Sequence, residues 1–183
     1  MAEPLSPADR LQPLRRTRQY REFEPTPLDE ATLDALLDVA RWTGSSANSQ
    51  PWRFIVITDP ATIRKIAEIG VPQTRGLGTA PAAIAIVLPA PERGANDAYD
   101  DGRVTERLLV AASMLDLGAG ISWIKVGVRP AVNELLGIPD DHLVRTIVQV
   151  GHPTAAARAP KAAPGEARLP RDQTVFRERW PAD

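Results

Sequence analysis

The chain has 183 residues, a formal net charge of -1 and no cysteine. The near-neutral charge argues against nucleic-acid binding and against attraction to an anionic membrane surface. The absence of cysteine excludes disulfides, thiolate catalysis and thiolate metal sites, and two histidines without a ligand pattern around them do not predict a metal enzyme. Length and a hydrophobic content of 43% suit one globular domain, expected to span residues 1–183.

The apolar runs predict no membrane span. The longest run, Ala80 to Leu88, contains Pro81 and is far shorter than the roughly 20 residues needed to cross a bilayer. The N-terminal residues lack the basic and apolar regions of a signal peptide. Together with the absence of cysteine, these features lead us to expect a cytoplasmic protein.

The first half of the chain predicts helix, strand and helix. A helix is expected from residues 26–29 up to Gly44, because residues 33, 36, 37 and 40 place apolar side chains on one face. Residues 53–58 predict a strand, and their continuous apolar run indicates burial on both faces. Asp59 is expected to cap a helix that Gly70 ends.

The second half predicts a buried strand over residues 82–88 and a long helix over 100–117 that Gly118 ends. Strands over 121–126 and 144–150 flank a short helix over 130–136, which Gly137 stops. The stretches 89–97 and 152–169 are rich in Pro and Ala and predict loops. This alternation indicates a three-layer α/β or α+β sandwich, with strand direction left open.

Four arginines precede the first firm helix, at positions 15, 16, 18 and 21. Guanidinium groups can grip phosphate oxygens with paired hydrogen bonds, although a basic stretch is also typical of a solvated surface segment. Downstream, residues 44–54 include the polar side chains of Ser45, Ser46, Asn48, Ser49 and Gln50. Such groups offer donors and acceptors without charge and suit a polar ring system or sugar chain. The alternative is a polar loop whose Trp52 only packs in the core.

Both segments resemble motifs of the nitroreductase-like flavoproteins. Residues 18–23, followed by Pro27, resemble the family's Arg-Ser-x-Arg-x-Phe…Pro motif, with Gln19 in place of serine and Thr17 where many members have a further arginine. Residues 45–52 resemble its Pro-Ser-x-x-Asn-x-Gln-Pro-Trp loop, with Gly44 in place of proline. Further likenesses at 117–124, 135–139 and 150–153 extend the resemblance over residues 15 to 180.

The resemblance implies an α+β fold, a three-layer α/β/α sandwich with a mostly antiparallel central sheet, in a homodimer with FMN at the interface. The tail, about residues 165–183, is expected to pack on the partner subunit. The loop is expected to reach the cofactor from the neighbouring subunit, and Val126 and Gly127 through their backbone. The residues implied in FMN binding are Arg18, Gln19, Arg21, Ser45, Ser46, Asn48, Gln50, Gln73, Val126, Gly127 and Arg168.

The implied function is an FMN-dependent NAD(P)H oxidoreductase that transfers hydride through FMN N5 to a small organic acceptor, such as a nitroaromatic or a quinone, in a ping-pong reaction. No protein side chain is expected to be catalytic, because the cofactor carries the chemistry. The glycines at 76–78 and 118–120 do not complete G-x-G-x-x-G, so no Rossmann site is expected. The choice between NADH and NADPH stays open, with Arg75 and Arg93 as candidate contacts to a 2′-phosphate.

Three alternatives remain at this stage. The first is an FMN-binding or storage protein without enzymatic activity. The second is a specialised family member, such as a flavin-degrading enzyme, a dehalogenase or a dehydrogenase, which the short connection between residues 89 and 100 disfavours. The third is a structural dimer without a cofactor.

Overall fold

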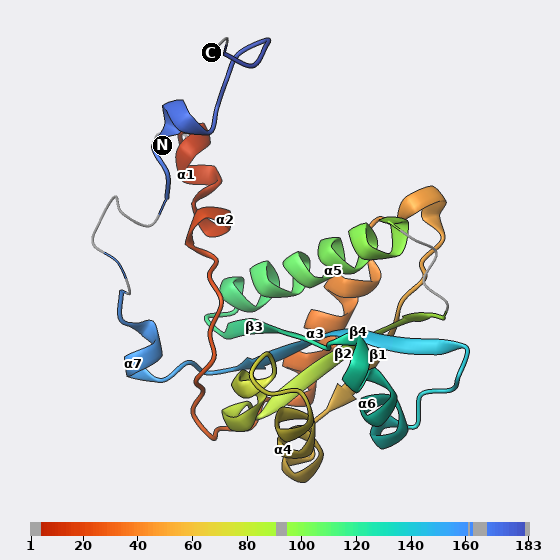
Figure 1. The fold of residues 1–183 in the computed structure, drawn as a ribbon. Helices are drawn as coiled ribbons and strands as arrows, with labels where there is room; N and C mark the ends of the chain where they lie inside the picture. Colours follow the sequence, from red (N-terminus) through yellow and green to blue (C-terminus); the bar gives the residue numbers. More distant parts are fainter. Residues whose placement is uncertain (1–4, 91–94, 161, 163–167, 182–183) are drawn as a thin grey trace.

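The computed structural model describes residues 5–90, 95–160, 162 and 168–181. At its centre lies an antiparallel sheet of four strands in the order β1-β2-β4-β3 (Figure 1). The strands are β1 (Arg53–Ile57), β2 (Ala82–Pro89), β3 (Gly118–Trp123) and β4 (His142–Gly151). The antiparallel central sheet expected from the family resemblance is confirmed.

Helices cover both faces of the sheet, which confirms the three-layer α+β sandwich (Figure 1). One face carries α3 (Glu30–Arg41) and α5 (Ala95–Met114), and the other carries α4 (Pro60–Ile69) and α6 (Arg129–Leu136). The shorter helices are α1 (Pro7–Arg10), α2 (Gln12–Arg16), α7 (Ala155–Arg158), and the 3-10 turns η1 (Ser46–Asn48), η2 (Arg75–Thr79), η3 (Val126–Val128) and η4 (Arg171–Gln173).

Within the described ranges, no helix combines the length and apolar character needed to cross a membrane. In the same part of the chain, no three metal-ligating side chains of the His, Cys, Asp or Glu type gather in one place.

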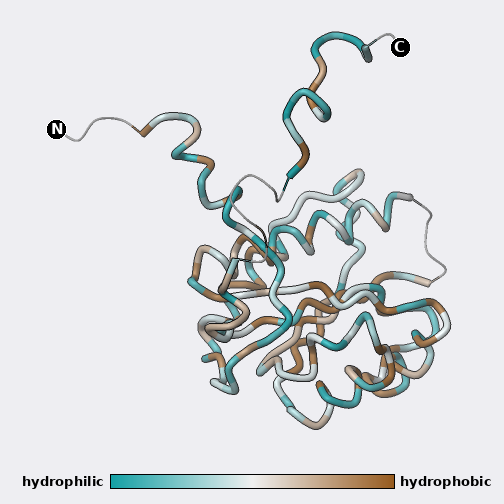
Figure 2. The backbone as a smooth tube through the Cα atoms, turned by 60° about the vertical axis from the view of Figure 1, so that its left-hand side comes forward, coloured by the Kyte–Doolittle hydropathy of each residue, from teal (hydrophilic) through white to brown (hydrophobic). Residues whose placement is uncertain are grey.

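Strand β2 shows why the core has two halves. Its residues at positions 82, 84, 86 and 88 pack toward α3 and α5, and those at 83, 85 and 87 pack toward α4 and α6. Successive side chains of a strand point to opposite faces, so a continuous apolar run is buried on both sides only in the middle of a sandwich. Figure 2 shows this concentration of hydrophobic residues in the centre of the body.

Strand β1 differs from its prediction. It begins and ends where expected to within one residue, but it lies at the edge of the sheet and is not buried on both faces. Phe54 and Ile55 are half-buried, and Val56 is 37% exposed. An apolar run predicts that a strand forms but not whether it lies at the centre or at the edge of the sheet. That position depends on pairing with segments distant in the sequence.

Two predicted helix ends are also corrected. Helix α3 begins after Asp29, one of the two expected starts, whose side chain accepts a hydrogen bond from the Thr32 amide at 2.6 Å, but it ends at Arg41, before Gly44. Helix α5 ends at Met114, and Asp116 supplies the left-handed turn with φ 57°. Gly118 therefore opens β3, three residues earlier than predicted, and Val126 falls beyond that strand, in η3.

The glycines at the start of β3 make room for the N-terminal segment. The Tyr20 amide donates to the Ala119 carbonyl at 2.8 Å, so residues 19–20 run along the edge of β3. A Cβ atom on Gly120 would lie 2.1 Å from the Tyr20 carbonyl oxygen. These glycines therefore serve close backbone packing, in agreement with the absence of a dinucleotide motif.

The predicted cap of α4 is confirmed and gives a pH-dependent test. Asp59 accepts hydrogen bonds from the Thr62 hydroxyl at 2.6 Å and the Thr62 amide at 2.8 Å. The side-chain bond from Thr62, followed by the backbone bond, lowers the pKa of Asp59 below the ordinary value of 3.8. The stabilisation by this carboxylate is therefore present above pH 3.8 and is lost as the pH falls through the lowered pKa.

We expect Asp59→Ala to lower Tm at pH 7, because two α4 amides lose their capping acceptor. The difference between the two proteins should shrink as the pH is lowered below 3.8, because the native protein then loses the charged cap that the variant already lacks. Thermal unfolding followed by circular dichroism at several pH values measures this. A Tm difference that stays constant down to acidic pH would contradict the assignment.

Candidate functional site

The polar loop, residues 44–50, has a strained backbone. Three of its residues other than glycine adopt left-handed conformations: Ala47, Asn48 and Gln50, with φ of 49°, 52° and 46°. This region costs a residue with a Cβ atom roughly 1–2 kcal/mol, although asparagine tolerates it better. Such strain persists where the surroundings hold it in place, and it concentrates at binding sites.

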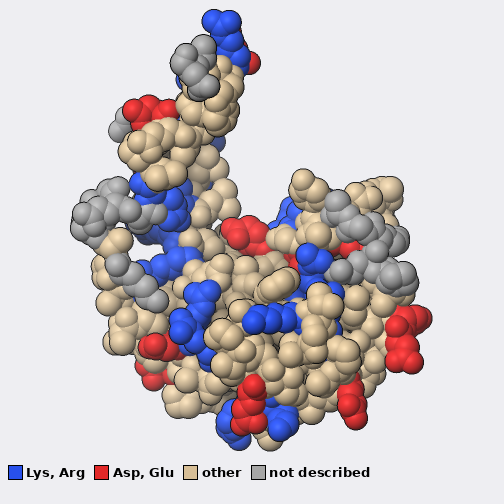
Figure 3. Space-filling model, viewed as in Figure 1, with Lys and Arg blue, Asp and Glu red and all other residues tan. Residues whose placement is uncertain are grey.

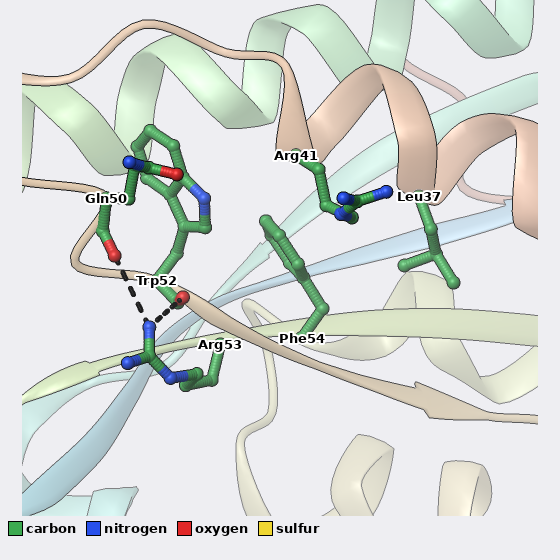
Figure 4. Close-up of a pocket in the computed structure, with 6 residues that line it drawn as sticks. All are labelled: Leu37, Arg41, Gln50, Trp52, Arg53 and Phe54. Atoms are coloured by element: carbon green, nitrogen blue, oxygen red, sulfur yellow. Dashed lines mark hydrogen bonds between the residues drawn. The ribbon is translucent and has the colours of Figure 1, made fainter. Parts of the chain in front are cut away.

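Hydrogen bonds at both ends of the polar loop hold this conformation. At its start, the Ser46 amide donates to the two carboxylate oxygens of Asp100 at 3.0 and 3.2 Å. The Ser45 hydroxyl accepts from the Gln50 amide at 2.8 Å, so this predicted flavin contact also closes the loop. At its end, Arg53 donates to the carbonyls of Gln50 and Trp52 (Figure 4).

Trp52 is buried and anchors the loop in the core, whereas the side chains at 46, 48 and 50 stay exposed. Gln50 also lies at the rim of a hollow of about 400 Å³ between α3 and β1, which Leu37, Arg41 and Phe54 line with it (Figure 4). The core role of Trp52 and an exposed polar surface therefore coexist in one loop.

A second group of predicted residues surrounds a hollow beside β3, which we call the amide hollow. Its volume is about 560 Å³, and its lining is Gln19, Arg21, Pro72, Gln73, Arg75, Ile121 and Trp123. The Gln19 carboxamide oxygen accepts from the Ile121 amide at 3.3 Å and from Arg21 at 3.4 Å. The Gln73 carboxamide oxygen is buried and has no hydrogen-bond partner among the described residues.

An adjoining hollow of about 770 Å³, which we call the arginine hollow, shares Gln19 with the amide hollow. Its lining is Leu14, Arg15, Arg16, Thr17, Arg18, Gln19, Glu106, Leu109 and Arg168. The structure thus brings Arg18 and Arg168 to one place. The Arg18 guanidinium also donates to the carbonyls of Ala157 and Arg158 and lies 4.9 Å from the Tyr20 ring centre. It is therefore partly engaged by α7, which the sequence did not indicate.

The side chains that line the two hollows carry mostly positive charge. Six arginines line them, and Glu106 is the one carboxylate in those linings. Figure 3 shows basic side chains across the middle and left of this face, with acidic ones mostly toward its rim. Neighbouring guanidinium groups repel one another, so an anion bound between them lowers the electrostatic energy.

The polar loop and these hollows do not meet within one chain. The loop is tied to Asp100, near the N-terminal end of α5, and no loop residue lines either hollow, whereas the arginine hollow includes Glu106 and Leu109, further along the helix. The helix rises about 9–14 Å between residue 100 and residues 106–109. One chain therefore presents two separate halves of the predicted constellation.

Val126 and Gly127 lie in η3 and are exposed, outside the linings of both hollows. A Cβ atom on Gly127 would meet nothing within 4 Å, so the fold itself does not require glycine there. Sequence reasoning missed Trp123 and Asp100 as site residues, and it named Arg75 only as a candidate phosphate contact. Arg93 lies outside the described residues.

Comparison with known proteins gives consistent matches. The pattern described as "Nitroreductase family" matches residues 14–75. A protein of Archaeoglobus fulgidus, provisionally named an NADH dehydrogenase/NAD(P)H nitroreductase, is 32% identical over 145 residues, which is 74% of this chain and 80% of that protein.

Solved structures share the fold. An FMN-dependent nitroreductase from Clostridium difficile superposes with a TM-score of 0.75 at 21% identity, over 90% of this chain and 97% of that chain. Nitroreductase A from Vibrio parahaemolyticus superposes with a TM-score of 0.77 at 20% identity, over 94% of this chain and 77% of that chain.

Proposed function

Because the chain belongs to the nitroreductase family and is therefore an oxidoreductase, we propose that it binds FMN and uses NADH or NADPH to reduce a small organic acceptor. The observation that carries the proposal is the polar loop: an exposed set of uncharged donors and acceptors on a left-handed backbone that the fold holds in place. A solvated connection needs neither the strain nor the support.

The residues present fit the chemistry of FMN. The arginine hollow suits the phosphate, since its guanidinium groups form charge-assisted hydrogen bonds to anionic oxygens. The amide hollow suits the ring and ribityl chain, and the buried Gln73 oxygen there still needs a donor. When bound, FMN supplies two-electron transfer between the nicotinamide and the acceptor.

The protein's own contribution is binding, orientation and electrostatics. Arg21 and Arg75 both line the amide hollow, and their positive charge favours the negative charge that a ring system gains on reduction. The exposed indole of Trp123 offers an aromatic surface at the same hollow. No side chain there needs to act as nucleophile or general base.

A homodimer completes the proposed site. Since the polar loop and the hollows lie apart in one chain, the loop of one subunit serves the hollows of the other. Apolar side chains on both arms of the molecule support association: Leu5, Leu11 and Leu14 at the N-terminal end, and Phe176 and Trp180 in the tail, are exposed. Figures 1 and 2 show both arms extending away from the body, and contact with a partner subunit would bury this surface.

The purified protein tests the proposal directly. We expect FMN to bind with an altered flavin absorbance spectrum, and anaerobic NADH or NADPH to bleach that spectrum. Renewed absorbance on adding a nitroaromatic or a quinone completes the cycle. Protein that is colourless and binds no added FMN would refute the proposal, and bound FMN that neither nicotinamide reduces would favour a storage role.

A further inference from the structure

We propose that Asp100 is a positioning residue for cofactor binding: its buried carboxylate holds the polar loop in the left-handed conformation that presents Ser46 and Asn48. The inference rests on the proposed function for its ligand, FMN, but its geometric basis is independent of it. Asp100 lies on α5, outside the loop, and belongs to none of the sequence motifs.

The contacts of Asp100 converge on the start of η1. The residue is 2% exposed, and both of its carboxylate oxygens accept from the Ser46 amide. A carboxylate that accepts from a backbone amide forms a charge-assisted bond, about twice as strong as a neutral one. This bond fixes the first amide of the turn that includes left-handed Ala47 and Asn48.

Arg103 completes the arrangement one helical turn further along α5. Its Nη1 lies 3.3 Å from Asp100 Oδ1, so the buried carboxylate has a counterion whose side chain is about half exposed. A Cβ atom on Gly44 would lie 2.8 Å from Arg103 Nη2. Gly44 thus leaves space for the end of the Arg103 side chain at the entry to the loop.

Losing the carboxylate should free the loop without removing any polar side chain from it. The Ser46 amide would lose its charged acceptor, and Ala47, Asn48 and Gln50 would relax toward right-handed conformations that cost less. The exposed side chains at 46 and 48 would then no longer be presented in one orientation, so affinity for FMN should fall.

The test is Asp100→Asn, which preserves shape and removes the charge. In the flavin-free protein, amide hydrogen exchange at Ser46 should accelerate about 5-fold, and the Kd for FMN should rise about 5-fold, because a charge-assisted hydrogen bond is replaced by the weaker neutral one that the Asn carboxamide oxygen can still accept. A merely structural role would lower Tm and leave the Kd of the folded protein unchanged. Native exchange at Ser46 together with native FMN affinity would overturn the proposal.

Two further variants keep the test decisive. Gly44→Ala displaces the end of the Arg103 side chain without altering Asp100 or the polar side chains. It should also accelerate exchange at Ser46 and raise the Kd for FMN, each by a smaller factor. This variant replaces Asp100→Asn in the test if Asp100→Asn does not fold. Asp34→Asn, an exposed aspartate on α3, should change neither. If the native protein binds no FMN, the proposed function fails, whereas the exchange measurement still decides whether Asp100 holds the loop.

Discussion

Dimers that carry Arg21→Ala in one subunit and Asn48→Gly in the other are expected to recover FMN binding in one of their two sites. Arg21 lines the amide hollow, whereas Asn48 belongs to the polar loop, no residue of which lines either hollow of its own chain. If each site combines Arg21 of one subunit with the loop of the other, the mixed dimer contains one doubly altered site and one fully native site.

Arg21→Ala alone should bind FMN at least about 10-fold more weakly at both sites, since a hydrogen bond to a charged group contributes roughly 1.5–3 kcal/mol, and Asn48→Gly alone about 5-fold more weakly, since a neutral hydrogen bond contributes roughly 1 kcal/mol. Glycine is used at position 48 because it accepts the left-handed backbone, where φ is 52°, while removing the carboxamide. The mixed dimer should therefore hold about half of the native flavin content at native affinity.

Coexpression with two different affinity tags, tandem purification and FMN titration measure this recovery. Ser49→Ala, in the same loop but with a right-handed backbone, replaces Asn48→Gly in the control and should leave FMN binding unchanged. Mixed dimers with no site of native affinity would show that each site lies within one chain, and a protein that stays monomeric would refute the shared site directly.

Sequence reasoning was most successful where the cause of a structure is local. The cap at Asp59 and the end of α6 at Gly137 were both predicted, because short-range hydrogen bonding and the lack of a Cβ atom, which lets Gly137 adopt φ 64°, determine them. The edge position of β1 was not predicted, because strand order arises from pairing between distant segments. The end of α5 was misplaced because Asp116, rather than a glycine, takes the left-handed turn.

The candidate site follows the same rule. Polar residue types in the loop and arginines near the N-terminus were visible in the sequence, and Gln19, Arg21 and Gln73 do come together in the structure. The support given by Asp100 was not visible, because one aspartate in a helix becomes informative only when the fold places Ser46 against it. The engagement of Arg18 by α7 has the same long-range origin.

Gly120→Ala is expected to be strongly destabilising, because the N-terminal segment lies directly over that position. The new Cβ atom would be 2.1 Å from the Tyr20 carbonyl oxygen and 2.6 Å from the Gln149 carboxamide nitrogen. Backbone cannot move aside as a flexible side chain does, so either β3 or residues 19–20 must shift. Overpacking of this kind typically costs about 1–3 kcal/mol, and 3 kcal/mol corresponds to roughly 6–12 °C in Tm for a domain of this size.

The same shift should act on the cofactor site, because Gln19 and Arg21 line the amide hollow from the displaced segment. We therefore expect weaker FMN binding together with faster hydrogen exchange of the Tyr20 amide, which bonds to the Ala119 carbonyl at 2.8 Å. Gly78→Ala is the matched control, since its Cβ atom would meet nothing within 4 Å and its backbone is not left-handed. Equal Tm values for the two variants would mean that the N-terminal segment does not lie on β3 in solution, and the residues assigned to the amide hollow would lose their common support.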